Sequence, residues 1–215
     1  RADVAVSPPG LHIRDLLRAG LESCIVTASV VPESQGVYRL DLASGEVVEL
    51  TPPGCWASAV AGDGLRVDIV ADPSEPGTTF TIVDGDRRIP VESFAERPLI
   101  QVTPSYATVA SRELRTCVLW PAGYLPGSGP LPIIVSPYGG PHAQRVVRSA
   151  GAYATDQWIA DQGFAVVIAD GRGTPGRGPA WDRAIVGDLA TRVLDDQVDA
   201  LQALAADQPD LDLAR

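Results

Sequence analysis

The stretch from Leu131 to Asp170 constrains the fold more than any other part of the chain. Two short apolar runs rich in β-branched residues, at 131–135 and 164–169, flank a glycine- and proline-rich loop and a helical stretch at 150–162. Continuous apolar runs are typical of strands that are buried on both faces of a parallel sheet. The order strand, loop, helix, strand therefore predicts a βαβ unit with a right-handed crossover.

Tyr138 and Asp170 each follow one of these two predicted strands. In open α/β sheets, ligands and reacting groups lie at the carboxyl ends of the strands. Tyr138 begins the turn Tyr138-Gly139-Gly140-Pro141, and a phenol held there is suited to donate a hydrogen bond to the oxyanion of an acyl-transfer intermediate. The alternative is a turn tyrosine with a packed ring and a hydrated hydroxyl. These residues alone leave both interpretations open.

From about residue 23 to residue 99 the chain consists of short strand patterns joined by turns. Two stretches, 24–50 and 56–91, have similar layouts, and Ser44-Gly45 predicts a hairpin turn in the first. Two similar meanders in succession predict blades of a β-propeller, with an ordinary meander or sandwich as the alternative. The boundary of this part is expected at 93–98.

Further elements are expected beyond that boundary. Strands are predicted at 99–103 and 114–120, and helices at 180–189 and 193–206. The i, i+4, i+7 spacing predicts that the second helix packs through an apolar face made of Leu194, Val198, Leu201 and Ala205. Three acidic residues near its start are predicted to be solvated: Asp195, Asp196 and Asp199.

Composition excludes several classes of function. The net charge of −10 argues against a nucleic-acid partner, because binding to phosphates needs a basic surface. No apolar run approaches the length of about 18 residues that crosses a membrane, and the N-terminus lacks the layout of a signal peptide. Three widely spaced cysteines fit reduced thiols in a cytoplasmic protein, and two histidines exclude a histidine-rich metal site.

A glycine motif after the second strand resembles a dinucleotide-binding fingerprint. The glycines at 171, 173 and 176 have the G-x-G-x-x-G spacing. The fingerprint requires a helix that starts within the motif, and Pro175 and Pro179 interrupt that position. We therefore expect a loop here and no bound cofactor.

No serine of the chain lies in the G-x-S-x-G nucleophile elbow of α/β-hydrolases. In that fold the catalytic residues follow the chain order Ser, then Asp or Glu, then His. If the elbow does not occur before the acids and histidines of this chain, those residues are not triad members. This argument excludes Asp170, Asp188, Asp196 and His142.

Four motifs in order carry a resemblance to a known family: Tyr138-Gly139-Gly140-Pro141, Asp170-Gly171-Arg172-Gly173, Gly187-Asp188-Leu189 and Asp196-Gln197. With them the sequence resembles the prolyl oligopeptidase family of serine peptidases, and within it the dipeptidyl peptidase IV branch. The resemblance implies that residues 1–95 are the C-terminal part of a β-propeller. It implies that 96–215 are the N-terminal half of an α/β-hydrolase catalytic domain, truncated before a nucleophile on a strand that begins just past Arg215.

The resemblance also implies a function. Tyr138 matches the tyrosine whose hydroxyl contributes to the oxyanion hole in that branch, whereas the acylaminoacyl-peptidase branch usually has histidine there. The parent protein would be a cytoplasmic serine exopeptidase or oligopeptidase that hydrolyses short peptides without a metal or cofactor, and the chain itself would be inactive. An acylaminoacyl peptidase or esterase on the same scaffold is one alternative, and a non-catalytic interaction module is another. The substrate-binding residues are unknown, and homo-oligomerisation is left open.

Overall fold

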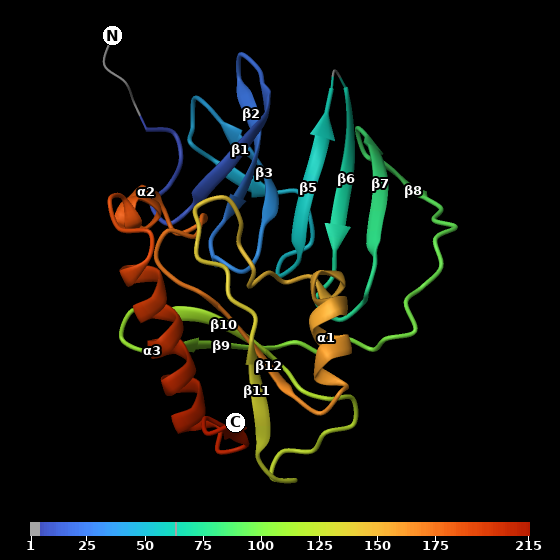
Figure 1. Cartoon of the computed structure of the whole chain (residues 1–215). Coiled ribbons are helices and arrows are strands. Elements are labelled where there is room, and N and C mark those ends of the chain that lie inside the picture. Colours follow the sequence, from blue (N-terminus) through green and yellow to red (C-terminus); the bar gives the residue numbers. More distant parts are fainter. Residues whose placement is uncertain (1–4, 63) are drawn as a thin grey trace.

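The computed structural model describes residues 5–62 and 64–215. The strands of this part form three sheets, two of which are four-stranded antiparallel meanders that lie side by side in Figure 1. The first meander consists of β1 (His12–Ala19), β2 (Ser23–Ser29), β3 (Gly36–Asp41) and β4 (Val47–Glu49). The second consists of β5 (Trp56–Ala61), β6 (Leu65–Ala71), β7 (Thr78–Asp84) and β8 (Arg87–Val91).

The two predicted meanders are confirmed, but the sequence did not reveal β1. This strand pairs with β2 through two register shifts, between Ile13 and Asp15 and between Leu16 and Arg18. Such bulges interrupt the alternation of apolar and polar residues on which a strand prediction depends. The Ser44-Gly45 turn lies where it was expected, and Asp41 stabilises it by accepting hydrogen bonds from the N–H groups of Ala43 and Ser44.

The third sheet has the strand order β13-β11-β12-β10-β9. Its strands are β9 (Ser105–Val109), β10 (Leu114–Leu119), β11 (Leu131–Val135), β12 (Ala165–Asp170) and β13 (Leu211–Asp212). β11 runs parallel to β12 and to β13, whereas β10 runs antiparallel to β12 and β9. The predicted βαβ unit is therefore confirmed, and Asp170 is the last residue of β12.

One strand prediction was wrong. The segment 99–103 is not a strand, because Leu99 is fully exposed and Val102 packs into the core without a partner strand; the strand follows Pro104 as β9. The sequence also did not reveal the short strand β13, in which Leu211 lies opposite Leu131; the strand expected just past Arg215 stays a prediction.

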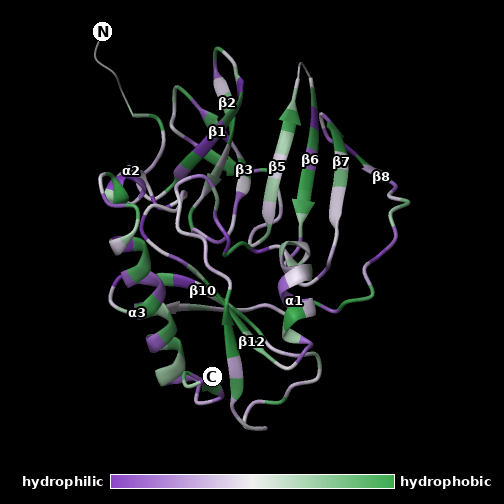
Figure 2. Cartoon of the chain, in the orientation of Figure 1, coloured by the Kyte–Doolittle hydropathy of each residue, from purple (hydrophilic) through white to green (hydrophobic). Residues whose placement is uncertain are grey.

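The third sheet is covered on its two faces by different helices. On one face Cys117, Val166 and Ile168 pack with Tyr153 of η1 (Ala150–Tyr153) and Ala160 of α1 (Ala154–Ala160). On the other face the alternate strand residues pack with α3 (Thr191–Asp207). These are Val118, Ala165 and Val167, which meet Ala200 and Leu204. Figure 2 shows the hydrophobic central strands between α1 and α3.

The prediction that both central strands are buried on both faces holds for β12 only. Every residue of β12 is buried, whereas β11 is half-buried along its length. The reason is the position of β11 beside β13, a strand of two residues that leaves it close to the sheet edge.

The predicted face of the last helix was wrong in its first half only, because Leu201 and Ala205 do pack against the core. α3 buries Asp196, Gln197, Ala200 and Leu204, while Leu194 and Val198 are 63% and 42% exposed. Asp196 has no exposed surface, so it is not a solvated residue of the helix start. The spacing of apolar residues identifies a candidate buried stripe on the helix. It gives no information on the ion pairs of a buried acid, and here these ion pairs orient the helix.

The helix expected at 180–189 is shorter than predicted. It consists of α2 (Pro179–Asp182) and η2 (Arg183–Ile185), and Gly187 follows with a φ of +82°. Within the described residues, no helix is long and apolar enough to cross a membrane. The coarse fold prediction, β-meanders followed by an α/β sheet, is confirmed, whereas the division at residue 95 stays a prediction.

Candidate active site at the carboxyl ends of the parallel strands

Tyr138 lies in the loop that follows β11, at the carboxyl end of the parallel strands. Its side chain is half-buried and belongs to none of the three apolar clusters. Among the described residues, no protein group forms a hydrogen bond with its hydroxyl. The ring is therefore not packed in a core, and its donor is free to bind another molecule.

The two glycines after Tyr138 are required by close approach. Neither has a positive φ. A Cβ atom on Gly140 would lie 3.2 Å from the Tyr138 hydroxyl oxygen, and one on Gly139 would lie 2.1 Å from Cγ1 of Val193 in α3. The absence of a side chain at Gly139 thus leaves space for α3, and its absence at Gly140 leaves space for the Tyr138 hydroxyl.

Asp170 anchors the same loop from the end of β12. Its carboxylate accepts hydrogen bonds from the backbone N–H groups of Arg145, at 3.0 Å, and Val146, at 2.8 Å. Only 3% of the residue is exposed. Burial raises the pKa of Asp170 to about 6, and the two N–H bonds act in the opposite direction. This acid fixes backbone and is not free to act as a catalytic base.

The guanidinium group of Arg145 holds the beginning of the loop. It donates to Ser136 Oγ and to Asp156, both at 3.1 Å. The backbone N–H of Ser136 also donates to the Val167 carbonyl at 2.9 Å, so the chain leaves β11 in a fixed direction.

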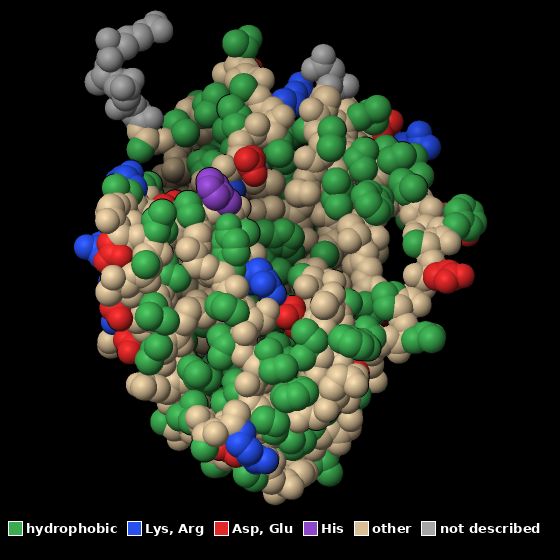
Figure 3. Space-filling view, in the orientation of Figure 1, with side chains coloured by type: hydrophobic (Ala, Val, Ile, Leu, Met, Phe, Trp, Pro, Cys, Tyr) green, Lys and Arg blue, Asp and Glu red, His purple; other side chains and the backbone are tan. Residues whose placement is uncertain are grey.

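The first meander contacts this loop from the other side. Arg14 of β1 donates to Gln144 Oε1 at 2.7 Å and to the Pro32 carbonyl at 3.0 Å. Gln144 Nε2 donates to the same carbonyl at 2.7 Å. Arg148 donates its backbone N–H to the Glu33 carbonyl at 2.7 Å. The loop with Tyr138 is thus held between two parts of the chain that are far apart in sequence. Figure 3 shows a hollow on this face, below the two meanders.

Asp196 is the centre of a buried ionic network. Arg172 donates from Nε and Nη2 to its carboxylate at 3.0 to 3.1 Å, and the backbone N–H of Arg172 donates at 2.6 Å. Arg112 approaches to 2.8 Å and also pairs with Asp199. The next residue, Gln197, donates to the Ala169 carbonyl at 2.9 Å. These contacts attach α3 to the end of β12.

The glycine motif at 171–176 is a loop, as expected. Three of its N–H groups have partners within the protein: Arg172 donates to Asp196, Gly173 to the Trp181 carbonyl and Thr174 to the Gly171 carbonyl. The following helix, α2, has four residues and begins only at Pro179. These three N–H groups are therefore not available to bind a pyrophosphate, and no helix starts within the motif to supply others.

The remaining acids and the loop histidine do not form a second site. His142 is exposed in the loop. Asp188 accepts the N–H groups of Ala190 and Thr191 ahead of α3, and these bonds lower its pKa. In the described ranges, no three His, Cys, Asp or Glu residues lie together in a manner that would hold a metal ion.

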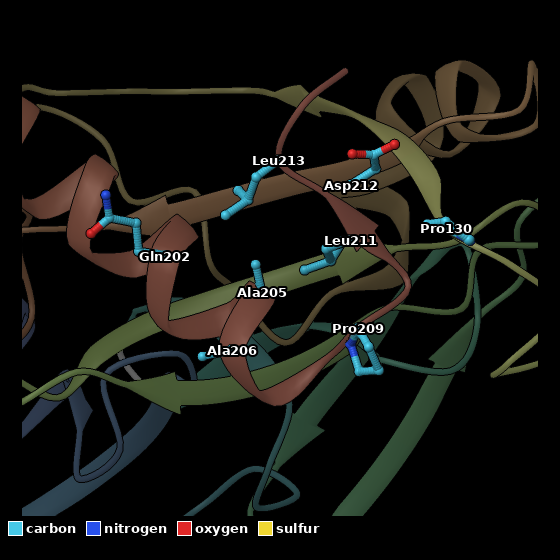
Figure 4. Close-up of a pocket in the computed structure, with 8 residues that line it drawn as sticks. All are labelled: Pro130, Gln202, Ala205, Ala206, Pro209, Leu211, Asp212 and Leu213. Atoms are coloured by element: carbon cyan, nitrogen blue, oxygen red, sulfur yellow. The ribbon is translucent and has the colours of Figure 1, made fainter.

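A separate groove of about 450 Å³ lies between the last turns of α3 and the segment around β13 (Figure 4). Its lining includes Pro130, which precedes β11, so it lies at the amino ends of the parallel strands. The groove is thus at the opposite end of the sheet from Tyr138.

The sequence did not reveal the residues that support Tyr138. Gln144, Arg145 and Val193 belong to no recognised motif, and Arg14 lies in the strand that was missed. Asp170 and Asp196-Gln197 were parts of motifs, without assigned partners.

Comparison with known proteins shows what this chain is similar to. Residues 152–215 match the model of the prolyl oligopeptidase family. Curated proteins similar to this chain agree with this match. Among its relatives, dipeptidyl aminopeptidase BIII of Pseudoxanthomonas mexicana is 32% identical over 116 residues, which are 49% of this chain and 16% of that protein. Dipeptidyl peptidase family member 1 of Caenorhabditis elegans is 35% identical over 75 residues, which are 34% of this chain and 9% of that protein.

The fold of this chain is also found in a solved structure. The crystal structure of Porphyromonas gingivalis dipeptidyl peptidase 4 superposes with a TM-score of 0.84 at 20% identity. The match covers 98% of this chain and 31% of that one. The chain therefore spans less than a third of each of these proteins.

Proposed function

We propose that the protein to which this chain belongs is a serine peptidase of the dipeptidyl-peptidase type, acting on short peptides through an acyl-enzyme. We further propose that Tyr138 supplies one hydrogen bond to its oxyanion hole. The observation that carries this proposal is a half-buried tyrosine hydroxyl, without a protein partner in the described structure, at the carboxyl end of β11. The names of the relatives support the type of peptidase.

The order of the strands supports an α/β-hydrolase domain. β13 lies parallel to β11, on the side away from β12, and the backbone N–H of Ile133 donates to the Arg215 carbonyl at 3.0 Å. A chain that continued along β11 at about 3.3 Å per residue would reach the level of the Tyr138 loop within a few residues. In α/β-hydrolases the nucleophile follows such a strand on a sharp turn. We therefore propose that the nucleophile follows β13, with the acid and the base later in the chain.

The proposed chemistry follows from this arrangement. A serine attacks the scissile carbonyl, and a histidine accepts the serine proton and later transfers it to the leaving amine. Negative charge then develops on the carbonyl oxygen, where the Tyr138 hydroxyl and the N–H of the residue after the nucleophile both donate. Tyr138 touches the reacting oxygen in this scheme and is therefore a catalytic residue.

The test is Tyr138→Phe in the full-length protein, assayed on dipeptide substrates that end in proline or alanine. Loss of one oxyanion donor typically lowers kcat by about 10²–10³-fold. We expect a loss of this size with little change in KM, because the donor acts mainly in the transition state. Tyr124→Phe is a matched control, since that hydroxyl donates to the Gly129 carbonyl before β11. An unchanged kcat for Tyr138→Phe would refute the role.

Two further measurements separate the alternatives. Full-length protein that cleaves acyl-amino-acid substrates but not dipeptide substrates would indicate an acylaminoacyl peptidase or esterase. A fluorophosphonate probe is expected to label the full-length protein and not the 215-residue chain; no labelling of the full-length protein would indicate a non-catalytic module. The cytoplasmic location and the expectations for other partners remain predictions from the sequence.

A further inference from the structure

Helix α3 is fixed to the sheet by contacts that leave it little freedom. The Asp196 carboxylate receives the Arg172 side chain, the Arg172 backbone N–H and the Arg112 guanidinium group. The Asp196 side chain is fully buried, and a Cβ atom on Gly171 would lie only 2.6 Å from its Cβ. Removing one partner of such a buried ion pair is strongly destabilising. The first turns of α3 therefore have one position against the end of β12.

The same helix contacts the turn that carries Tyr138. Val193 is in the first turn of α3, and its Cγ1 would lie 2.1 Å from a Cβ atom on Gly139. A valine in a helix has one strongly preferred χ1 rotamer, so its side chain cannot turn away at little cost. Two carbon atoms need about 3.5 Å. A side chain at position 139 would therefore displace the turn from the helix by more than about 1 Å.

We propose that α3 positions the oxyanion donor: Val193, held in place by the Asp196–Arg172 ion pair, sets the position of the Tyr138 hydroxyl through its contact with Gly139. This inference rests on the proposed function of Tyr138. Val193, Gly139 and Asp196 are positioning residues in this scheme, because they act through Tyr138 and do not touch the substrate.

The first experiment is a double-mutant cycle in the full-length protein. Gly139→Ala is expected to lower kcat by up to about 10²-fold, the size of effect that a displacement of about 1 Å can cause. Val193→Ala removes the atom that the new methyl group meets, so Gly139→Ala should cost at least about tenfold less in that background. Equal losses in both backgrounds, or no loss from Gly139→Ala, would overturn the proposal.

Gly140→Ala is the matched control for this cycle. A Cβ atom on Gly140 meets the Tyr138 hydroxyl itself, at 3.2 Å, and not the helix. Val193→Ala should therefore not rescue Gly140→Ala. Rescue of both glycine variants would show a general loosening of the loop and would overturn the assigned contact.

The readout separates positioning from folding. Activity is expressed as kcat per active site, titrated with a fluorophosphonate, together with KM. A merely structural role would lower the number of titratable sites and leave kcat per site unchanged, whereas positioning lowers kcat per site with KM little changed. In the Tyr138→Phe background, Gly139→Ala should lower kcat no further, because the hydroxyl through which it acts is absent.

Asp196→Asn tests the anchor of the helix. It keeps the shape of the side chain and removes the charge that binds Arg172, so kcat per site should fall. The exposed neighbouring residue provides the control Asp195→Asn, which should leave kcat unchanged. If Asp196→Asn does not fold, the kcat values of Val193→Ala and Val198→Ala are compared instead. Val198 is the control because it lies on the exposed side of the same helix. A fall in kcat for Val193→Ala alone supports the proposal, and equal values for both overturn it.

The failure of this inference differs from the failure of the proposed function. An active wild type whose Tyr138→Phe variant loses kcat, with no effect of Gly139→Ala, would refute only the positioning role. A wild type without peptidase activity would refute the proposed function. The contact would then still be tested by thermal unfolding, in which Val193→Ala should restore the midpoint temperature that Gly139→Ala lowers.

Discussion

Asp170→Asn tests whether a buried acid that anchors the Tyr138 loop makes the protein less stable as it ionises. In the folded state burial raises the pKa of Asp170 to about 6, from an ordinary value of 3.8. Below the lower value the group is neutral in the folded and the unfolded state. Between the two values the folded protein holds a proton that the unfolded chain has released.

The pH dependence of stability follows from this difference. A raised carboxyl pKa contributes stability that is present below about pH 4 and is lost as the pH rises through about 6. The shift is about two units, and each unit corresponds to about 1.4 kcal/mol. The contribution of Asp170 to the free energy of unfolding should therefore fall by up to about 3 kcal/mol over this range. Asparagine does not titrate, so the variant lacks this fall.

The assay is urea unfolding of wild type and Asp170→Asn at several pH values from 4 to 7.5, followed by circular dichroism. The difference in unfolding free energy, wild type minus variant, cancels the titration of the other carboxyl groups. It should decrease as the pH rises and level off above about 6.5. A difference that is flat, or that increases with pH, would show that the two N–H bonds outweigh burial, and the reasoning would be wrong.

Three more predictions follow from the described contacts. Leu204→Ala should lower the free energy of unfolding by about 2–5 kcal/mol, whereas Leu194→Ala on the exposed side of α3 should change it by less than about 0.5 kcal/mol; chemical denaturation distinguishes the two. A thiol reagent at pH 8 should modify Cys24 in the folded protein well before Cys117, whose pKa burial raises to about 12; equal rates, measured by mass spectrometry, would contradict this. Addition of NAD⁺ should leave the midpoint of thermal unfolding unchanged, because three N–H groups of the glycine loop already have protein partners and no helix begins within it; a saturable rise would contradict this.

The sequence predicted the elements whose residues carry a local signal. The β-branched runs at β11 and β12 identified the parallel strands, and with them the carboxyl-end position of Tyr138. Turn residues and alternation located most strands of the two meanders. β1 was not predicted because its bulges interrupt the alternation of apolar and polar residues. β9 was not predicted because the apolar residues before Pro104 pack into the core without pairing with a strand.

What could not be predicted depends on partners that are distant in sequence. The apolar stripe of α3 indicated one buried face. Arg112 and Arg172 instead form ion pairs with Asp196, so that the helix buries the face on which Asp196 lies. The role of Gly139 likewise required the position of Val193, which no local pattern supplies. The fold class could therefore be derived from spacing, whereas the support of the candidate site could not.

The contact between the first meander and the Tyr138 loop has a consequence for protein engineering. Arg14, Pro32 and Gln144 form one hydrogen-bonded set that joins β1 and the β2–β3 loop to the loop after β11. A chimaera that takes its meanders from one relative and its α/β sheet from another would divide this set between two parents. Such a hybrid should keep this contact only where the parents supply matching side chains at positions 14 and 144, since Pro32 contributes only its backbone carbonyl.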